Sequence, residues 1–463
     1  MVTIERFAGI SSESIAAFRC TIEGEVITPE DGAYGSARQL WNAAFQKFPG
    51  VIVRAATTED VVRAIHFADE HQAPIAVRSG GHSLAGLSSN DGGVVIDLSR
   101  MDAVEVDPDT RQAWVQPGVT SEVLAAATLP HGLVLTTGDA PTVGIGGLTL
   151  GGGIGWFVRK HGLTIDHLLE VEVVMADGRV LVANQREHAD LFWAVRGGGG
   201  NFGIVTRYHF RLNQTGPVLV GAILLPMTPE AVRGYVGVAT AAPDELSTQL
   251  ILASAPPAPF VPQDVVGTPV AMVVACWSGD HDEGRAVLAR FSELAGGPLV
   301  ELVEAMPYAA MFELMREPTR PGLYGSVRSS FLRSIEDGLI EAMLTELPPG
   351  ESIAQIRVLG GAMARVSPEA TAFAHRDKPY LLLFAGSGVD ERDGAEAAAW
   401  VERAWTRSET WADGAYVNFL SDRDAGARVH EAYPAATYQR LADVKSRYDP
   451  DNRFRGNQNV RPS

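Results

Sequence analysis

The chain has 463 residues, of which 46% are hydrophobic and 20% are charged, and its formal net charge is −18 at pH 7. This composition predicts a globular protein of two or three domains and excludes global disorder. The acidity and the absence of a Lys/Arg cluster in the sequence argue against nucleic acid as the main partner. The two cysteines, Cys20 and Cys276, are too far apart for a disulfide framework or a structural zinc site.

Targeting and membrane signals are not predicted. The first 18 residues include Glu5 and Arg6 and have no long apolar run, so they do not resemble a signal peptide. The apolar stretch 270–277 is far shorter than the ~20 residues of a membrane helix, and we predict a buried strand there. We therefore expect a cytoplasmic protein without a membrane partner.

Short strands and helices are predicted through the first half of the chain. A helix over 58–68 begins with Thr58, Glu59 and Asp60, which are favoured in a first turn. A second helix is predicted over 120–128, and a hairpin turns at Asp177-Gly178 between strands 169–175 and 179–183. Further strands are predicted at 50–54, 74–78, 94–98, 113–117 and 204–212. This is an α+β organisation without regular βαβ alternation.

The composition changes near Gly216-Pro217. From about 218 to 405, strands 218–225, 270–277, 353–359 and 380–385 alternate with helices 283–295 and 335–345. The tail after about 406 ends in a polar run. The sequence thus predicts three parts: a first domain over 1–215, a second over 216–405, and a C-terminal segment over 406–463.

Glycine is concentrated in three windows of the first part. Residues 80–93, 138–155 and 197–203 hold 18 of the 48 glycines, where even spacing would give about four. Glycine gathers where the backbone needs positive φ or must approach a ligand closely. We therefore expect this part to bind a large cofactor with phosphates.

The run Gly198–Gly203 has the spelling G-x-G-x-x-G. A dinucleotide-binding fingerprint must follow a strand and open a helix. Here a predicted helix over 190–195 precedes the run and a strand follows it, so the context is reversed. We interpret the run as a tight turn, and an NAD(P)-dependent reductase is disfavoured.

The other two windows leave alternatives open. The loop after strand 74–78 can cradle a pyrophosphate with its amide groups, although His82 there is equally compatible with a hydrogen-bonded surface histidine. The window 138–155 is either a compact buried turn or a backbone wall against a planar ligand. No metal is predicted, because the eleven histidines show no H-x-x-x-H spacing.

Taken together, four ordered motifs are specific. They are Arg-Ser-Gly-Gly-His-Ser at 78–83, the Pro-Thr-Val-Gly run with its glycines at 141–155, Arg-Gly-Gly-Gly-Gly-Asn-Phe-Gly at 196–203 and the ending from Tyr448-Asp449-Pro450 to Asn457-Gln458-Asn459. Over essentially the whole chain, the sequence resembles the berberine-bridge-enzyme-like group of FAD-linked oxidases in the vanillyl-alcohol-oxidase superfamily. The resemblance implies the two-domain PCMH-type FAD-binding fold, with an antiparallel-sheet substrate domain covered by helices.

The resemblance also implies how the cofactor is held. His82 matches the histidine that this family bonds to the 8α-methyl of FAD. Many relatives carry a second flavin link from a cysteine, and that position is Ala140 here, so a single link is expected, as in the nicotine-oxidase-like members. The cofactor-binding residues implied are Arg78, Ser79, Gly80, Gly81, His82, Ser83, Gly86, Pro141, Thr142, Val143, Gly146, Gly147, Gly151, Gly153, Gly155, Gly203, Ile204, Val205, Asn457 and Asn459.

Four further residues are candidates for the substrate side. Tyr416 and Asn418 match the Tyr-x-Asn segment that returns to the flavin in this family, and Tyr416 can act as a base only if its pKa falls from about 10. The alternative is a core tyrosine. Gln355 and Arg357 share one face of a predicted strand, where they contact either substrate or solvent.

We therefore expect an oxidase that removes hydride from a hydroxylated or amine-bearing small organic molecule. Oxygen then reoxidises the flavin and yields hydrogen peroxide, and the small Val143 side chain, at a position that this family associates with oxygen access, favours that reaction. An oligosaccharide oxidase, a flavin dehydrogenase with another acceptor and a non-catalytic flavin carrier are the alternatives.

Overall fold

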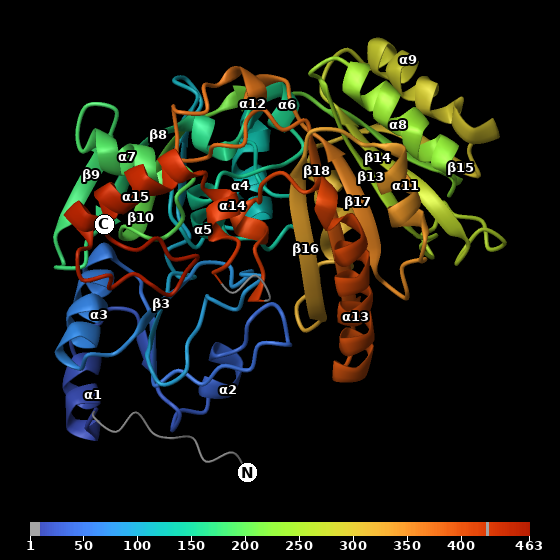
Figure 1. The fold of residues 1–463 in the computed structure, drawn as a ribbon. Helices are drawn as coiled ribbons and strands as arrows, with labels where there is room; N and C mark the ends of the chain where they lie inside the picture. The colour runs from blue at the N-terminus through green and yellow to red at the C-terminus, as the bar shows by residue number, and fades with distance from the viewer. Residues whose placement is uncertain (1–9, 423–425) are drawn as a thin grey trace.

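The structure is a computed structural model that describes residues 10–422 and 426–463. Two lobes lie side by side (Figure 1). The first contains the N-terminal half of the chain together with its last segment, and the second contains a large antiparallel sheet covered by helices. The α+β fold class predicted from the sequence is confirmed.

A small mixed sheet forms the N-terminal part of the first lobe. Its strand order is β1-β2-β4-β3, with β2, β4 and β3 parallel. The strands are β1 (Glu25–Ile27), β2 (Val51–Arg54), β3 (Ile75–Arg78) and β4 (Val94–Asp97), and the helices beside them are α1 (Ser12–Arg19), α2 (Tyr34–Ala37) and α3 (Thr58–Glu70). The α3 helix starts where the Thr57 hydroxyl accepts a hydrogen bond from the amide of Asp60. The end of β3 leads directly into the first glycine window.

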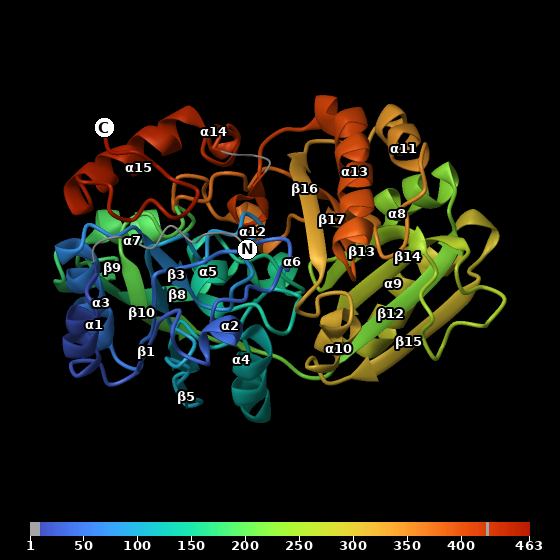
Figure 2. The same cartoon turned by 90° about the horizontal axis from the view of Figure 1, so that it is seen from below.

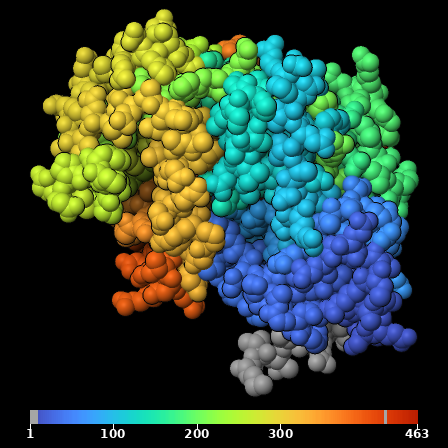
Figure 3. Space-filling view, turned by 180° about the vertical axis from the view of Figure 1, so that it is seen from behind, coloured from blue at the N-terminus to red at the C-terminus, as the bar shows by residue number. Residues whose placement is uncertain are grey.

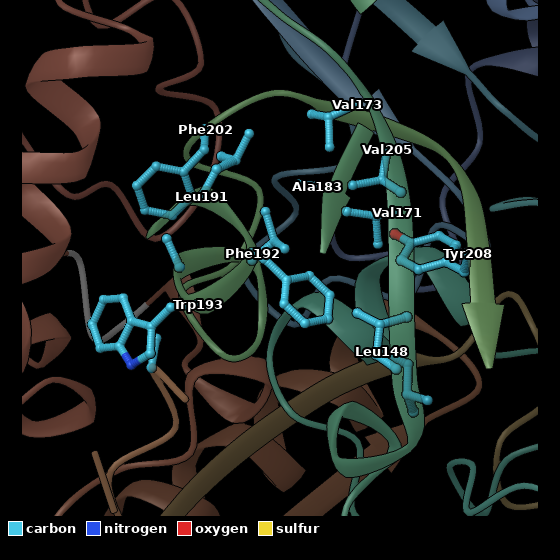
Figure 4. Packing of buried hydrophobic residues seen from close by; sticks show 14 of the residues in the cluster. Leu148, Val171, Val173, Ala183, Leu191, Phe192, Trp193, Phe202, Val205 and Tyr208 are labelled. Atoms are coloured by element: carbon cyan, nitrogen blue, oxygen red, sulfur yellow. The ribbon is translucent and has the colours of Figure 1, made fainter. Parts of the chain in front are cut away.

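A five-stranded antiparallel sheet forms the rest of that lobe, in the order β5-β6-β10-β8-β9. Its strands are β5 (Val104–Asp107), β6 (Gln112–Val115), β8 (Leu168–Val174), β9 (Val180–Asn184) and β10 (Ile204–Arg211). The predicted hairpin at Asp177-Gly178 is present, with Gly178 at φ +81°. The sheet packs through Val171, Val205 and Tyr208 on Phe192 of helix α7 (Ala189–Val195) (Figure 4).

Short elements connect these sheets. They are α4 (Ser121–Thr128), α5 (Ile145–Leu150), α6 (Val158–His161) and the two-stranded pair β7 (Leu133–Val134) and β11 (Asn213–Gln214). The α5 helix lies inside the glycine window 138–155, which we expected to be either a turn or an extended wall. Its six residues include Gly146 and Gly147. Because glycine is a poor helix former, the sequence did not predict a helix there.

The second lobe is a seven-stranded antiparallel sheet in the order β15-β12-β14-β13-β17-β18-β16. Its strands are β12 (Val218–Pro226), β13 (Leu246–Ser254), β14 (Pro269–Trp277), β15 (Val300–Met306), β16 (Tyr324–Leu332), β17 (Ile353–Val358) and β18 (Tyr380–Gly388). Its helices are α8 (Pro229–Ala241), α9 (His281–Ser292), α10 (Ala310–Arg316), α11 (Asp337–Leu344), α12 (Ala362–Arg365) and α13 (Glu391–Ser408).

The two faces of this sheet have different partners (Figure 2). Side chains such as Ile223, Leu250 and Ile356 pack under the helices in one hydrophobic core. The alternate side chains of the same strands face the first lobe, where Val220 and Ile251 pack with Trp156. Seen from behind, the N-terminal residues and the yellow-to-orange sheet lobe meet along this boundary (Figure 3). The candidate site therefore has walls from both lobes.

The C-terminal segment returns to the first lobe. Helix α14 (Val429–Ala432) leads into α15 (Ala435–Tyr448), which lies beside α7, and Leu441 joins the core of the five-stranded sheet (Figure 1). Among the described residues, no helix is long and apolar enough to cross a membrane. Within the same residues, no group of three histidine, cysteine or acidic side chains is placed to hold a metal ion.

Candidate active site

Two glycine-rich loops meet backbone to backbone at the end of β3. A Cβ atom on Gly80 would lie 2.5 Å from the amide nitrogen of Gly144, and one on Gly144 would lie 2.0 Å from Ser79 Oγ. Glycine is therefore required here for the contact between the loops. The contact brings the segment 78–83 and the segment 141–147, both assigned to the cofactor, into one site.

The first of these loops exposes unpaired amides. Within residues 10–422 and 426–463, no acceptor takes a hydrogen bond from the amide groups of residues 79–83. A run of free N–H groups in a turn is an anion-binding concavity, which fits the phosphates of a dinucleotide. Ser79 does not add its hydroxyl to that cradle, because the hydroxyl donates to Pro117 O at 2.5 Å. Ser83 accepts a hydrogen bond from the Leu87 amide and keeps its own proton free.

Arg78 supports the loop from behind. Its guanidinium is buried and donates to Asp97 and to the Ala37 carbonyl, both at 2.7 Å. These contacts pair the guanidinium charge of Arg78 with groups of the protein itself. Arg78 therefore positions the loop, and the loop amides remain as the groups that face a phosphate.

His82 stands at the edge of a cavity of about 480 Å³ between the lobes. Its Nε2 lies 2.8 Å from Thr142 Oγ1, and its ring stacks on Trp41 with centroids 4.9 Å apart. Nδ1 has no hydrogen-bond partner in the described part of the chain. Burial lowers the pKa of His82 to about 4, so the ring is neutral at pH 7 and one of its two nitrogens carries a lone pair.

A segment that the sequence analysis missed closes this cavity. Trp41 Nε1 donates to Thr319 O at 2.7 Å, and the amide of Gly322 donates to Trp41 O at 2.9 Å. Asn42 makes a further pair of hydrogen bonds with Gly325 at 2.9 and 3.1 Å. The ends of these contacts are about 280 residues apart in the chain, so no local pattern indicates them.

The later glycines of the window 138–155 are packed closely within the protein. A Cβ on Gly153 would lie 1.9 Å from Thr164 Oγ1, and one on Gly155 would lie 1.6 Å from Thr137 O. These glycines are needed for close packing within the protein. By contrast, Gly147 is exposed and faces open space, as does Gly200, so these two leave room for a ligand.

The turn at 197–203 is tied to the C-terminal tail. Asn457 Nδ2 donates to Gly200 O at 3.0 Å, while its Oδ1 is buried without a partner among the described residues. Asn459 Oδ1 is buried and unpaired in the same way, which fits a hydroxyl or ring N–H donor of a cofactor. Ile204 and Val205 bury their side chains in two hydrophobic cores, so only their backbone can face the cofactor.

Tyr416 is the buried phenol of the site. Its hydroxyl oxygen accepts hydrogen bonds from the Gly153 amide at 3.0 Å and from Asn418 Nδ2 at 2.9 Å. Both lone pairs are thus used, and the phenolic proton has no acceptor among the described residues. Burial raises the pKa of Tyr416 above its usual value of about 10, although these two hydrogen bonds oppose the shift.

Asn418 is fixed by its surroundings. Its Nδ2 also donates to Leu148 O at 3.0 Å, and a Cβ on Gly151 would lie 2.1 Å from its Oδ1. The aromatic rings of Phe331, Phe373 and Phe419 surround Tyr416 at centroid distances of 5.0 to 6.3 Å. The phenol is therefore held in one orientation.

Gln355 and Arg357 face the first lobe, and both are buried. Arg357 forms an ion pair with Asp139, and Gln355 Nε2 donates to Gln249 Oε1 at 2.7 Å. Gln249 Nε2 in turn donates to Asp139 Oδ2 at 2.8 Å. The structure thus excludes solvent-facing side chains, and it adds Asp139 and Gln249, which the sequence analysis did not single out. Gln249 of β13 lies directly opposite Arg357 of β17, so the strand pairing is the signal that leads to it.

Comparison with known proteins agrees with this site. The FAD binding domain model matches residues 49–184, and the model described as berberine and berberine like matches residues 415–461. (R)-6-hydroxynicotine oxidase of Paenarthrobacter nicotinovorans is 30% identical over 456 residues, which cover 96% of this chain and 97% of that protein. Xylooligosaccharide oxidase of Thermothelomyces thermophilus is 29% identical, covering 90% of this chain and 88% of that protein.

A solved structure has a similar fold over nearly the whole chain. The crystal structure of 6-hydroxy-D-nicotine oxidase from Arthrobacter nicotinovorans matches with a TM-score of 0.82 at 28% identity, covering 96% of this chain and 98% of that chain. The free amides at 79–83 and the open space at Gly147 are what FAD requires of its site. The chain belongs to the berberine-bridge-enzyme-like group of FAD-linked oxidases in the vanillyl-alcohol-oxidase superfamily.

Proposed function

We propose that the chain oxidises an amine-bearing small organic molecule and that its FAD is bonded only to His82. The bound flavin accepts a hydride from the substrate and passes the electrons to O2, which gives hydrogen peroxide. The observation that carries the substrate class is the hydrogen-bonding state of Tyr416, which keeps its proton at neutral pH.

A site whose tyrosine stays protonated favours amine substrates over alcohol substrates. An alcohol that loses a hydride must also lose its hydroxyl proton, so it needs a base. A neutral amine needs none, because its nitrogen lone pair stabilises the cation that hydride loss leaves at the adjacent carbon. In this proposal Tyr416 donates its one free proton to a heteroatom of the substrate and thereby orients the reacting C–H bond.

A single flavin link is supported by the residues around the loop 138–142. The free Nδ1 of His82 borders the cavity, and the neutral ring is the nucleophilic form. Ala140 has no thiol, while Cys20 lies at the end of α1 and Cys276 lies buried in β14. His82 is thus the nucleophile we assign to the link.

A carbohydrate oxidase is the second candidate. Chitooligosaccharide oxidase of Gibberella zeae is 26% identical over 98% of this chain and 96% of that protein, and the xylooligosaccharide oxidase is a comparable relative. Sugar oxidation would require Tyr416 to ionise, and the buried phenol opposes this. An amine is therefore preferred.

Anaerobic mixing of the holoenzyme with matched pairs of compounds tests the proposal. Cyclic amines and the corresponding alcohols, together with xylobiose, are compared by bleaching of the flavin absorbance, and air is then admitted with a peroxide-coupled assay. We expect amines alone to bleach the flavin and peroxide to form on admission of air. Faster bleaching by xylobiose would reject the amine proposal, and slow reoxidation in air would identify a dehydrogenase.

The flavin link has a separate test. Acid-precipitated wild-type protein should stay yellow, whereas His82→Ala should release its FAD into the supernatant. Yellow precipitate from His82→Ala would contradict the assignment of His82.

A further inference from the structure

We infer that Asp139 makes the substrate site electrically neutral and so restricts the enzyme to uncharged substrates. This inference rests on the proposed function, because it concerns what the same site accepts. Asp139 belongs to the loop that carries Ala140 and Thr142, whereas Arg357 belongs to β17 of the other lobe. Their ion pair joins the flavin-binding side of the site to the wall opposite.

The ion pair lies on the side of the site that carries Tyr416. Arg357 is close enough to the Tyr416 hydroxyl for its charge to favour the phenolate. Across the sheet, Arg357 is opposite Leu381, which is in turn opposite Phe331, and the Phe331 ring lies 6.3 Å from that of Tyr416. Asp139 precedes Thr142 by three residues in the same loop, and Thr142 contacts His82. The pair thus links the wall near the phenol to the loop that contacts the histidine.

The network around Asp139 fixes which atoms face the site. One Arg357 nitrogen is committed to Asp139, and the Gln355 amide donates through Nε2 to Gln249. Among the described residues, Arg357 Nη1 and Gln355 Oε1 have no partner, and neither is a fully buried atom. The site therefore presents one donor and one acceptor, side by side on β17.

Asp139 neutralises the charge of Arg357 without presenting a free carboxylate of its own. Its Oδ2 already accepts from Gln249 and from Arg357, and its Oδ1 is buried out of reach. The side chains of Asp139 and Arg357 are only 11% and 8% exposed, so water screens neither charge well. An anion consequently meets an arginine that is already neutralised, and a cation finds no free carboxylate.

Among the other ionisable groups nearby, Lys160 donates to the Ser278 carbonyl and acts on Cys276 with the sign opposite to that of Asp139, while the remaining groups are neutral. Burial raises the pKa of Tyr308 and of Cys276 far above 7, so both stay neutral. The pKa of His161 is lowered to about 4 by burial, and it is neutral as well. A charged substrate would lose its hydration without gaining a counter-charge, which disfavours its binding. An amine substrate therefore binds in its neutral form.

Three ring compounds of similar shape test the inference on the oxidised holoenzyme. Benzamide, benzoate and the benzylammonium ion are titrated against the flavin absorbance at pH 8, which requires no turnover. Wild type should bind benzamide at least about tenfold more tightly than either ion. Equal or tighter binding of benzoate or benzylammonium by wild type would overturn the inference.

The inference predicts opposite changes in ligand binding for substitutions of the two paired residues. Asp139→Asn leaves Arg357 unpaired and should tighten benzoate binding by about tenfold or more. Arg357→Gln leaves Asp139 unpaired and should tighten benzylammonium binding instead. Flavin content reports on folding, and Asp166→Asn is the matched control, because it breaks the equally buried pair of Asp166 with Arg376. A correctly loaded Asp139→Asn that binds benzoate no better than wild type or the control would reject the role of Asp139.

These readouts are independent of the reaction. A holoenzyme that shows the expected binding pattern but is bleached by no amine would reject the proposed function alone. A holoenzyme that amines bleach but that binds benzoate as well as benzamide would reject only the role of Asp139.

Discussion

Lys445 Nζ lies 2.6 Å from a carboxylate oxygen of Asp449, and both side chains are wholly buried. Lys445 also donates to Asn201 O at 2.6 Å and to Phe454 O at 2.9 Å. Asp449 accepts from the amides of Arg453 and Phe454. The pair thus joins helix α15 to the glycine turn at 197–203 and to the tail that carries Asn457 and Asn459.

Breaking this pair should release the tail. Asp449→Ala leaves a buried ammonium without its counter-ion, and a cost of roughly 3–5 kcal/mol is expected. The urea midpoint of unfolding, followed by flavin fluorescence, should fall accordingly. Arg447→Met is the control, since the exposed pair of Arg447 with Asp190 should contribute about 0–1 kcal/mol. A midpoint for Asp449→Ala equal to that of the control would contradict the assignment.

Tyr416→Phe should slow flavin reduction by roughly 10- to 100-fold, because it removes the donor to the substrate and leaves the Gly153 amide and one N–H of Asn418 Nδ2 without an acceptor. Anaerobic stopped-flow bleaching with the best amine measures this. Flavin content should stay at the wild-type level. Reduction at the wild-type rate would show that the phenol takes no part in the reaction.

Two neighbouring glycines should respond differently to alanine. Gly144→Ala forces a Cβ to within 2.4 Å of the Gly80 amide, so the loops must separate and the protein should lose stability even without cofactor. Gly147→Ala meets nothing within 4 Å and should leave the apoprotein unaffected. If FAD lies against Gly147, this variant should nevertheless bind FAD more weakly. Thermal unfolding of apoprotein and a flavin titration separate the two effects.

Acid should destabilise the holoenzyme between pH 6.5 and pH 4. Burial lowers the pKa of His167 to about 4, so over this range the unfolded chain takes up a proton that the folded chain does not. The contribution of neutral His167 to the free energy of unfolding is complete above pH 6.5. It is lost as the pH falls, by up to about 3 kcal/mol. His167→Asn should show a shallower fall of its unfolding midpoint than wild type, and parallel curves would contradict this.

Val143→Leu should slow reoxidation by O2 and leave reduction by substrate unchanged. Val143 is half-buried between the loop that carries Thr142 and helix α5, on the side expected to admit oxygen. Stopped-flow mixing of the reduced variant with aerated buffer measures the rate, and Val143→Ala is the control. A Leu variant that reoxidises as fast as wild type would place oxygen access elsewhere.

Much of this architecture is predictable from local pattern. Strand β14 has an apolar run of the right length, β10 alternates buried and partly exposed residues over its second half, and the glycine windows identify a cofactor lobe. The helix α5 was not predicted, because glycine is a poor helix former. Its stability comes from tertiary packing of Ile145 and Leu148. The glycines at 153 and 155 pack against Thr164 and Thr137, which no sequence pattern indicates, and their assignment to the cofactor stays a prediction.

The site itself was predictable only in part. His82 and Tyr416 are identified by resemblance, and the structure shows both hydrogen-bonded, His82 half-buried and Tyr416 buried. Asp139 was not predicted, because one aspartate in a loop has no periodicity and its partner Arg357 lies 218 residues away. Such long-range pairing depends on how two lobes meet, which no local sequence pattern specifies.

The return of the C-terminal segment has a consequence for how the flavin site is assembled. Lys445 donates to Asn201 O and Asn457 donates to Gly200 O, so residues that lie 244 and 257 positions later in the chain hold the glycine turn in place. A chain cut before Lys445 has every glycine loop but lacks this side of the site. We therefore expect FAD loading to require the C-terminal segment.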